Sequence, residues 1–567
     1  MTLTETNQEA EAVASGDDLR PETEAVASGD DLRPATQSSA SQWTPPTGLA
    51  GILSTGDHRV IGRLYIVFSL ILSGLALIVG MLIGIEQADI DGGFGVFGQA
   101  NELFQVFGLY RTTLILCGLV PFFLGLATAV IPNQIRASSV AFPRAAAAAF
   151  WTWLVGAIAH IAATFSYGGL GSFQADAARG QSVELTVLSL GMIGLGLLAG
   201  AGVIFTTLVT QRPSGMDLLQ VPAFSWSMLV ATGVWLFSLP VLLANLVVSW
   251  VDMRGAGTLA FGGGEAPFEL VAWAFDAPQV YAWTIPLLGI TAEVFTSAHR
   301  SSPRLFEPMA FIVGAFGLLS FGAWAQSFFD SADPLADDAH IVTNEVLFAA
   351  FALAIAPVVL AYGGWLAFNA YSAGQRPQIT PQFALVTLSG ALLTAAVVTG
   401  VLRVAEPALG VLREADADIW RGFFDAMDDL EGSSLVTGMM NFAVLGGLLA
   451  AVAGLFHWAP RLLGRPLNAP LGFLSVLPLA GGAVLVGATD ALGGFFDQPA
   501  RPYEAGDPPY GPGHFDEIDA LGFVEALNVI GLIGYIAVLG GLALVALNVA
   551  RTLAASPGAE ADRGGPE

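Results

Sequence analysis

Two residue types are almost missing from this chain of 567 residues. It contains no lysine, so all 21 basic residues are arginine, and 47 acidic residues bring the formal net charge to −26. This excess of negative charge argues against nucleic acid as a partner. Cysteine occurs once, at Cys117 within an apolar run. One cysteine excludes a disulfide framework and a cysteine-based zinc cluster.

Charged residues of either sign are also scarce. Only 12% of the residues are charged, 54% are hydrophobic, and the mean hydropathy is +0.66. A soluble protein of this length needs a charged surface to stay dispersed, so this composition predicts a membrane protein whose main contact is lipid. The acidity is compatible with a solvated outer surface and with adaptation to high salt.

The charged residues that do occur are concentrated at the N-terminus and in a few loops. Residues 1–55 are rich in Glu, Asp, Ser, Thr, Pro and Ala, and the sequence EAVASGDDLRP occurs twice, at residues 11–21 and 24–34. Such a segment buries too little apolar surface to offset its conformational entropy. We expect a disordered tail over residues 1–55, a membrane domain over 56–552, and a short disordered tail over 553–567. No cleavable signal peptide is visible.

Long apolar runs fill the membrane domain. Each has about 20 or more residues, enough to cross a hydrocarbon core of roughly 30 Å as a helix. The runs cover residues 62–86, 104–131, 146–166, 185–209, 225–251, 268–297, 307–329, 341–370, 381–402, 433–458, 470–496 and 522–550. The sequence therefore predicts an all-α polytopic membrane protein with about twelve transmembrane helices.

The arginines predict the orientation in the membrane. If the helices alternate in direction, one side of the membrane collects Arg59, Arg63, Arg136, Arg144, Arg212, Arg300, Arg304, Arg376, Arg461, Arg465 and Arg551. The opposite loops, residues 86–91, 330–338, 416–431 and 504–519, are acidic. Since basic loops stay in the cytoplasm, both termini are predicted to be cytoplasmic.

Several short segments resemble, in order and spacing, subunit I of the haem–copper terminal oxidases, such as cytochrome c oxidase. They are residues 57–65 (DHRVIGRLY), 131–135 (IPNQI), 140–144 (VAFPR), 215–217 (GMD), 221–227 (VPAFSWS), 278–281 (PQVY), 285–286 (IP) and 456–460 (FHWAP). The resemblance extends over roughly residues 55–550. It implies a bundle of twelve helices in the plasma membrane of a prokaryote, and a place among the subunits of a respiratory complex.

The resemblance also implies two haems, but the residues at the ligand positions differ. Phe107 and Met440 occupy the two positions that hold the low-spin haem in the family, and Gly438 occupies the ligand position of the oxygen-binding haem. Haem iron of this type needs imidazole nitrogen, and Phe107 and Gly438 have no side-chain donor. For Met440 we favour core packing over ligation through its thioether.

The copper site that the resemblance implies has lost its histidines in the same way. Ala277, Gln326 and Ser327 stand at the three histidine positions, whereas Tyr281 is retained where the family has a redox-active tyrosine. Copper that changes oxidation state prefers imidazole to amide or hydroxyl ligands. We therefore predict no haem and no copper, and interpret Tyr281 as a packing residue.

Proton transfer in the family uses acidic and lysine side chains within the membrane. At those positions the resemblance places Ser139, Gln279 and Ala361, none of which is ionisable at neutral pH. A proton pump without such residues has no mechanism of the familiar kind.

Several charged residues fall inside predicted spans, and three of them are singled out here. Arg111 follows Phe107 by one helical turn, Asp276 precedes Ala277, and Asp490 lies in the eleventh run. A charge in hydrocarbon costs several kcal/mol unless it is paired or hydrated. We hypothesise that Arg111 pairs with Asp276 or Asp490 and fills the former haem space. The alternative is that all three lie near the outer interface and reach water.

Three functions are compatible with these residues. The first is a degenerate, cofactor-free paralogue with a structural or assembly role in a respiratory complex. The second is an active terminal oxidase with ligands that the motifs do not reveal. The third is a transporter that uses the emptied interior as a polar path, with Arg111, Asp276 and Gln326 along it.

Overall fold

The computed structural model describes residues 48–89, 95–97, 100–166, 168–170, 177–254, 267–325, 339–403, 433–496, 498–499 and 521–554. The chain divides into two units, Met1–Gly51 and Ile52–Glu567. The predicted N-terminal tail up to residue 47 and the C-terminal residues 555–567 lie outside the described part. Within residues 1–55, Leu49–Leu53 form a short helix, α1.

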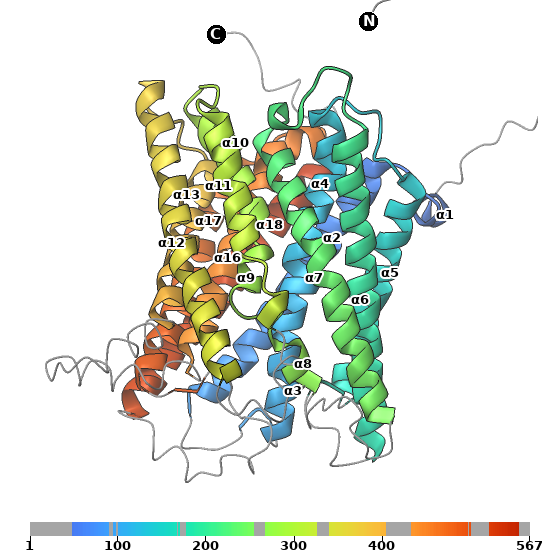
Figure 1. Ribbon diagram of the computed structural model, residues 1–567, viewed down its shortest axis with the longest axis vertical. Coiled ribbons are helices and arrows are strands. Elements are labelled where there is room, and N and C mark those ends of the chain that lie inside the picture. Colours follow the sequence, from blue (N-terminus) through green and yellow to red (C-terminus); the bar gives the residue numbers. More distant parts are fainter. Residues whose placement is uncertain are drawn as a thin grey trace, which may run out of the picture. The chain divides into compact units, whose positions relative to one another are not determined.

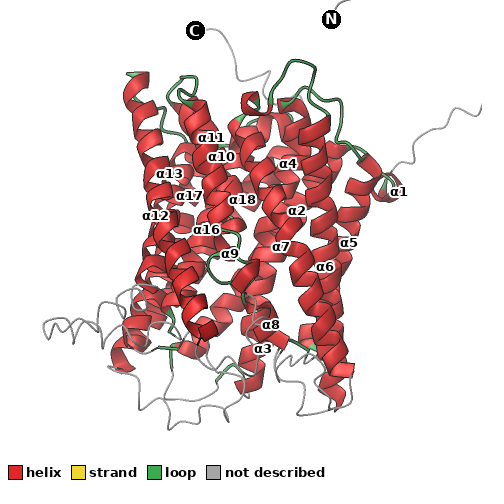
Figure 2. Ribbon diagram, in the orientation of Figure 1, coloured by secondary structure: helices red, strands yellow, loops and turns green. Residues whose placement is uncertain are grey.

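The described residues of the second unit form a bundle of helices that alternate in direction (Figures 1 and 2). In chain order the helices are α2 (His58–Gln87), α3 (Ala100–Thr112), η1 (Thr113–Leu119), α4 (Val120–Gln134), α5 (Pro143–Phe165), α6 (Ala177–Thr210), η2 (Leu218–Gln220), α7 (Ala223–Arg254), α8 (Pro267–Ala272), α9 (Gln279–Ala282), α10 (Ile285–Ala298), α11 (Phe306–Leu319), η3 (Ala323–Ala325), α12 (Ala339–Ala373), α13 (Pro381–Arg403), α16 (Leu435–Leu462), α17 (Ala469–Gly493), η5 (Gly494–Phe496) and α18 (Leu521–Ala554).

The lengths and compositions of these helices confirm an all-α polytopic membrane fold. Eleven helical stretches in the described residues are long and apolar enough to span a membrane, and Ile285–Ala298 is a shorter apolar helix. Helices satisfy their backbone hydrogen bonds internally, which hydrocarbon requires. The most hydrophobic windows of Gln105–Gln134 and Leu435–Leu462 are entirely buried, so these two segments form the centre of the bundle.

The prediction of one continuous helix over residues 268–297 is wrong. The structure breaks this span into α8, a turn, the single-turn α9 and α10. Pro278 and Pro286 lack the amide hydrogen that a continuous helix would use. Indole groups instead satisfy carbonyls in the break: Trp283 donates to Ala274 at 2.7 Å, and Trp235 donates to Ala282 at 2.9 Å.

The next span is also interrupted. The sequence predicts one helix over residues 307–329, but α11 ends at Leu319 and the 3₁₀ turn η3 follows. Residues 326–329 lie outside the described part. A side chain at Gly322 would have its Cβ 2.6 Å from the amide nitrogen of Gln279. The chain turns here because only glycine permits this approach to α9.

The second span contains a segment of π-helix that the hydrophobic pattern does not indicate. Residues Thr113–Leu119 (η1) connect α3 to α4, so the helix is widened at its centre. A π-helical turn changes which carbonyls are bonded within the helix. The indole of Trp153, on α5, donates to the carbonyl of Leu116 at 3.1 Å.

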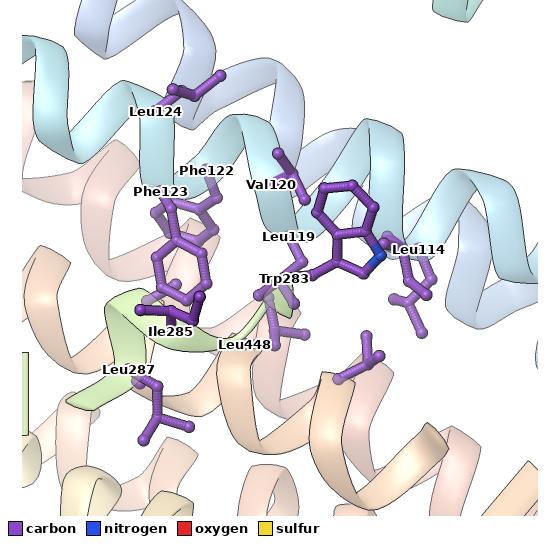
Figure 3. Packing of buried hydrophobic residues seen from close by; sticks show 14 of the residues in the cluster. Leu114, Leu119, Val120, Phe122, Phe123, Leu124, Trp283, Ile285, Leu287 and Leu448 are labelled. Atoms are coloured by element: carbon purple, nitrogen blue, oxygen red, sulfur yellow. The ribbon is translucent and has the colours of Figure 1, made fainter. Parts of the chain in front are cut away.

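Close packing joins the broken span to the two central helices. Figure 3 shows Trp283 and Ile285 among side chains of η1 and α4, with Leu448 of α16 nearby. Trp283 is fully buried, and so are Phe122 and Phe123 of α4. The middle of the bundle is therefore filled with apolar side chains.

The ends of the bundle differ in the loops that they carry. One end holds the start of α2, α5, α7, α11, α13 and α17 and the described loops 135–142, 211–222, 299–305, 374–380 and 463–468. We call it the arginine end, because these loops and the adjoining first turns contain most of the arginines used above to predict orientation. Its cytoplasmic location remains a prediction.

Gly62→Ala tests the packing of α2 on α4. The new Cβ would lie 2.6 Å from the Gly125 carbonyl oxygen and 2.9 Å from the Ala129 amide nitrogen. Backbone atoms cannot move aside cheaply, so we expect the apparent melting temperature in detergent to fall by several degrees. Gly364→Ala on α12 is the control, because no atom lies within 4 Å of its Cβ; it should not lower the melting temperature. Equal melting curves would contradict this account of the contact.

Candidate functional site

Arg111 is the most deeply buried charged side chain of the described residues, with 1% of its surface exposed. It belongs to the last turn of α3, one turn after Phe107. Its guanidinium carbon lies 4.4 Å from the centroid of the Phe107 ring, and Nη2 donates to the hydroxyl of Thr437 at 2.9 Å. A ring face and a hydroxyl do not neutralise a cation inside a membrane, so a carboxylate is required.

Asp276 supplies one carboxylate. Arg111 Nη1 lies 3.5 Å from Asp276 Oδ1, and the aspartate side chain is 18% exposed. The aspartate is placed there by the break in the sixth span, because it lies in the turn between α8 and α9. This ion pair therefore connects the second span to the broken one.

Asp490, on α17, lies close enough for its carboxylate to be attracted by Arg111. Its Oδ2 accepts a hydrogen bond of 2.7 Å from the side-chain amide of Asn441 on α16. The side-chain oxygen of Asn441, Oδ1, accepts a hydrogen bond of 2.8 Å from the Tyr110 hydroxyl. The hydroxyls of Tyr110 and Tyr535 lie 3.3 Å apart. One polar network thus joins α3, α16, α17 and α18.

The structure brings together the three charges that the sequence singled out. Arg111 contacts Asp276 and is electrostatically coupled to Asp490. The sequence reasoning missed the neutral members of this cluster, Thr437 and Asn441. Their spacing of i and i+4 on one helix, on either side of Gly438 and Met440, is a signal that the sequence contains.

The residues at the positions that the resemblance assigns to haem ligands do not fit a haem. The Phe107 ring is covered by Arg111. A Cβ at Gly438 would lie 2.5 Å from the amide nitrogen of Ala491, so α16 and α17 touch at this point. Met440 is fully buried in the core. Neither Phe107 nor Gly438 offers a side-chain donor atom, and at Gly438 there is no room for a larger side chain.

Among the positions that the resemblance assigns to the copper site, the structure describes Ala277 and Tyr281, and their surroundings do not fit a metal centre. The Tyr281 hydroxyl donates to the carbonyl of Ala396 on α13 at 3.0 Å. A cavity of about 10 Å³ beside Ala277 and Tyr281 has room for one water at most. Gln326 and Ser327 lie outside the described residues. Within the described part of the chain, no three His, Cys, Asp or Glu side chains cluster as metal ligands would.

The three positions that the resemblance assigns to proton transfer lie in different environments. Gln279 is fully buried, and its Oε1 accepts hydrogen bonds from Ser238 Oγ at 3.1 Å and from the Gly322 amide at 2.9 Å. Ser139 is partly buried in the loop between α4 and α5, and Ala361 is exposed on α12. Gln279 therefore connects three helical segments, and it needs an acceptor oxygen to do so.

The fold and these segments identify the class of protein. The family model described as Cytochrome C and Quinol oxidase polypeptide I matches residues 60–414, so the chain belongs to this family. The match ends before α16, the helix that carries Gly438 and Met440.

Individual relatives agree with this assignment. Cytochrome c oxidase subunit 1 of Bacillus sp. strain PS3 is 28% identical over 437 residues, which cover 74% of this chain and 65% of that relative. Quinol oxidase subunit 1 of Bacillus subtilis strain 168 is 27% identical over 432 residues, or 74% of this chain and 62% of that relative. The chain thus spans slightly less than two thirds of each. A haem–copper terminal oxidase dimer solved by cryo-EM has the same fold, with a TM-score of 0.62, 14% identity, and coverage of 88% of this chain and 84% of that one.

Arg111→Met tests whether the buried charges depend on each other. The substitution removes the positive charge that attracts the carboxylates of Asp276 and Asp490. We therefore expect the free energy of unfolding to fall by on the order of 2–3 kcal/mol, an effect that the partial exposure of Asp276 limits. Adding Asp276→Asn or Asp490→Asn should recover part of the loss. Melting curves in detergent measure both effects, with the exposed Arg144→Met as the control. A stable Arg111→Met protein would mean that the carboxylates are satisfied without the arginine.

Proposed function

We propose that this protein is a member of the oxidase subunit I family that binds neither haem nor copper and has a structural or assembly role in a respiratory membrane complex. It would be a multi-pass protein of a prokaryotic plasma membrane with both termini in the cytoplasm. Lipid and the other subunits of the complex would be its partners.

The observation that carries this proposal is the state of the ligand positions. Phe107, Gly438 and Ala277 offer no side-chain donor atom, and protein atoms fill the space around them. The Phe107 ring faces Arg111, Gly438 meets Ala491, and the space beside Ala277 amounts to about 10 Å³. A replaced ligand alone could leave an empty site, whereas these contacts give the same residues a packing role.

A structural role is consistent with what the chain retains. The bundle keeps its transmembrane helices and a large apolar outer surface, on which Leu360 and Leu477 are 69% and 79% exposed. The named relatives are subunits of oxidases, and a fold can be retained while the function of its site changes. The competing function is an active oxidase with ligands other than those expected from the family.

An absorption spectrum separates these two functions. We expect the tagged chain, purified in mild detergent from its native membranes, to show protein absorbance at 280 nm, no Soret band, and substoichiometric iron and copper. Subunit I of a haem–copper oxidase purified by the same procedure controls for loss of cofactor. A Soret band with one or more irons per chain would refute the cofactor-free proposal and support the oxidase.

Isolation of the native complex tests the structural role. We expect the chain to co-purify with other respiratory subunits in a constant ratio, and its deletion to lower the amount of the assembled complex in a blue native gel. Complementation with Arg144→Met should restore assembly, since that side chain is exposed. Recovery of the chain alone, with normal complexes in the deletion strain, would argue against this role.

A further inference from the structure

A pocket of about 930 Å³ opens at the arginine end of the bundle. It lies between η2 and the start of α7 on one side and the end of α10, the following loop and the start of α11 on the other, with His457 of α16 contributing to its wall. This volume is within the range of small-molecule sites. Two of the family-like segments, residues 221–227 and 456–460, contribute to its wall, whereas none of the positions that the resemblance assigns to cofactor ligands does.

The charge of the pocket wall is opposite to that of its surroundings. Among the described residues that line it are Glu293 and Glu307 but no arginine, although this end of the bundle carries most of the arginines. Glu307 is exposed in the first turn of α11, where the helix dipole favours a carboxylate. The helix dipole does not explain the carboxylate of Glu293, because this residue lies in the C-terminal half of α10, where the dipole does not favour negative charge.

Neighbouring elements hold Glu293 as a hydrogen-bond acceptor. The Gln134 amide donates to its two oxygens at 3.1 and 2.9 Å, and the Phe224 backbone N–H, in the first turn of α7, donates to Oε1 at 2.8 Å. The Ser225 hydroxyl donates to Gln134 Oε1 at 2.6 Å, which turns the amide nitrogen toward the glutamate. Three elements thus fix one carboxylate at the pocket wall.

The carboxylate retains capacity for another donor. Its Oε2 accepts one hydrogen bond, from Gln134, whereas a carboxylate oxygen can accept two. Among the described residues no arginine forms a salt bridge with Glu293, and Arg461 attracts it only from a distance. A positively charged hydrogen-bond donor in the pocket would complete this arrangement.

The rest of the wall is mainly apolar. Leu219 and Val221 contribute to one side, and Leu305 and Phe306 contribute to the other. We propose that this pocket binds an amphiphilic organic cation, in which a protonated amine or guanidinium donates to Glu293 and an apolar body packs against these four side chains. The inference does not depend on the proposed structural role, since it concerns a different part of the bundle.

A series of three ligands of the same shape tests the proposal on the unmodified protein. The detergent-purified full chain is titrated at pH 8 with 4-phenylbutylamine, the neutral 4-phenylbutanol and the anionic 4-phenylbutyrate, and binding to protein-free micelles is subtracted. We expect the amine to bind at least about tenfold more tightly than the alcohol, and the anion to bind most weakly. Equal affinities, or no saturable binding of the amine, overturn the proposal.

Two substitutions locate the site. Glu293→Gln should reduce the affinity for the amine to that for the alcohol and leave the affinity for the alcohol unchanged. Glu184→Gln removes a carboxylate that is paired with Arg254 away from the pocket, and should leave amine binding as it is. Unchanged amine binding in Glu293→Gln overturns the proposal. If Glu293→Gln does not fold, Ser297→Trp, at an exposed lining position, should block the amine instead, and unchanged amine binding in that variant also overturns it.

Discussion

The positive charge of Arg111 has to be neutralised inside a bundle where water is scarce, and much of the arrangement around it follows from that requirement. The guanidinium lies against Phe107, donates to Thr437 and pairs with Asp276. Because an uncompensated charge costs several kcal/mol in hydrocarbon, the second, sixth and tenth spans have to be positioned together. Asp490 and its amide partner Asn441 extend the same constraint to α17.

The broken sixth span makes that pairing possible. An unbroken helix would carry Asp276 along a continuous helical surface, whereas the turn between α8 and α9 places it opposite Arg111. The break exposes carbonyl groups, and the indoles of Trp283 and Trp235 satisfy two of them. Gln279 accepts hydrogen bonds from both neighbouring elements, α7 and the turn after α11. Irregular backbone is tolerated at membrane depth when it is buried in protein in this way.

In this family, the residues that determine the helical bundle differ from those that determine cofactor chemistry. The fold is shared with a haem–copper terminal oxidase, and it depends on hydrophobicity and close helix contacts. The cofactor chemistry depends on a few donor atoms, which can be replaced without altering the bundle. In this chain Tyr281 and Gln279 donate and accept hydrogen bonds within the protein. These contacts give both side chains a packing role in the bundle.

The sequence by itself determined the membrane class, the approximate limits of the helices and the family, because the length and apolarity of each span leave few alternatives to a transmembrane helix. It also indicated that Arg111, Asp276 and Asp490 needed partners. It did not indicate the break in residues 268–297, the π-helical turn at Thr113–Leu119 or the role of Asn441. Those features depend on which side chains meet across helices, such as the indole of Trp153 at the carbonyl of Leu116. Only the tertiary structure decides them, because hydropathy specifies that a segment is buried but not which segments pack together.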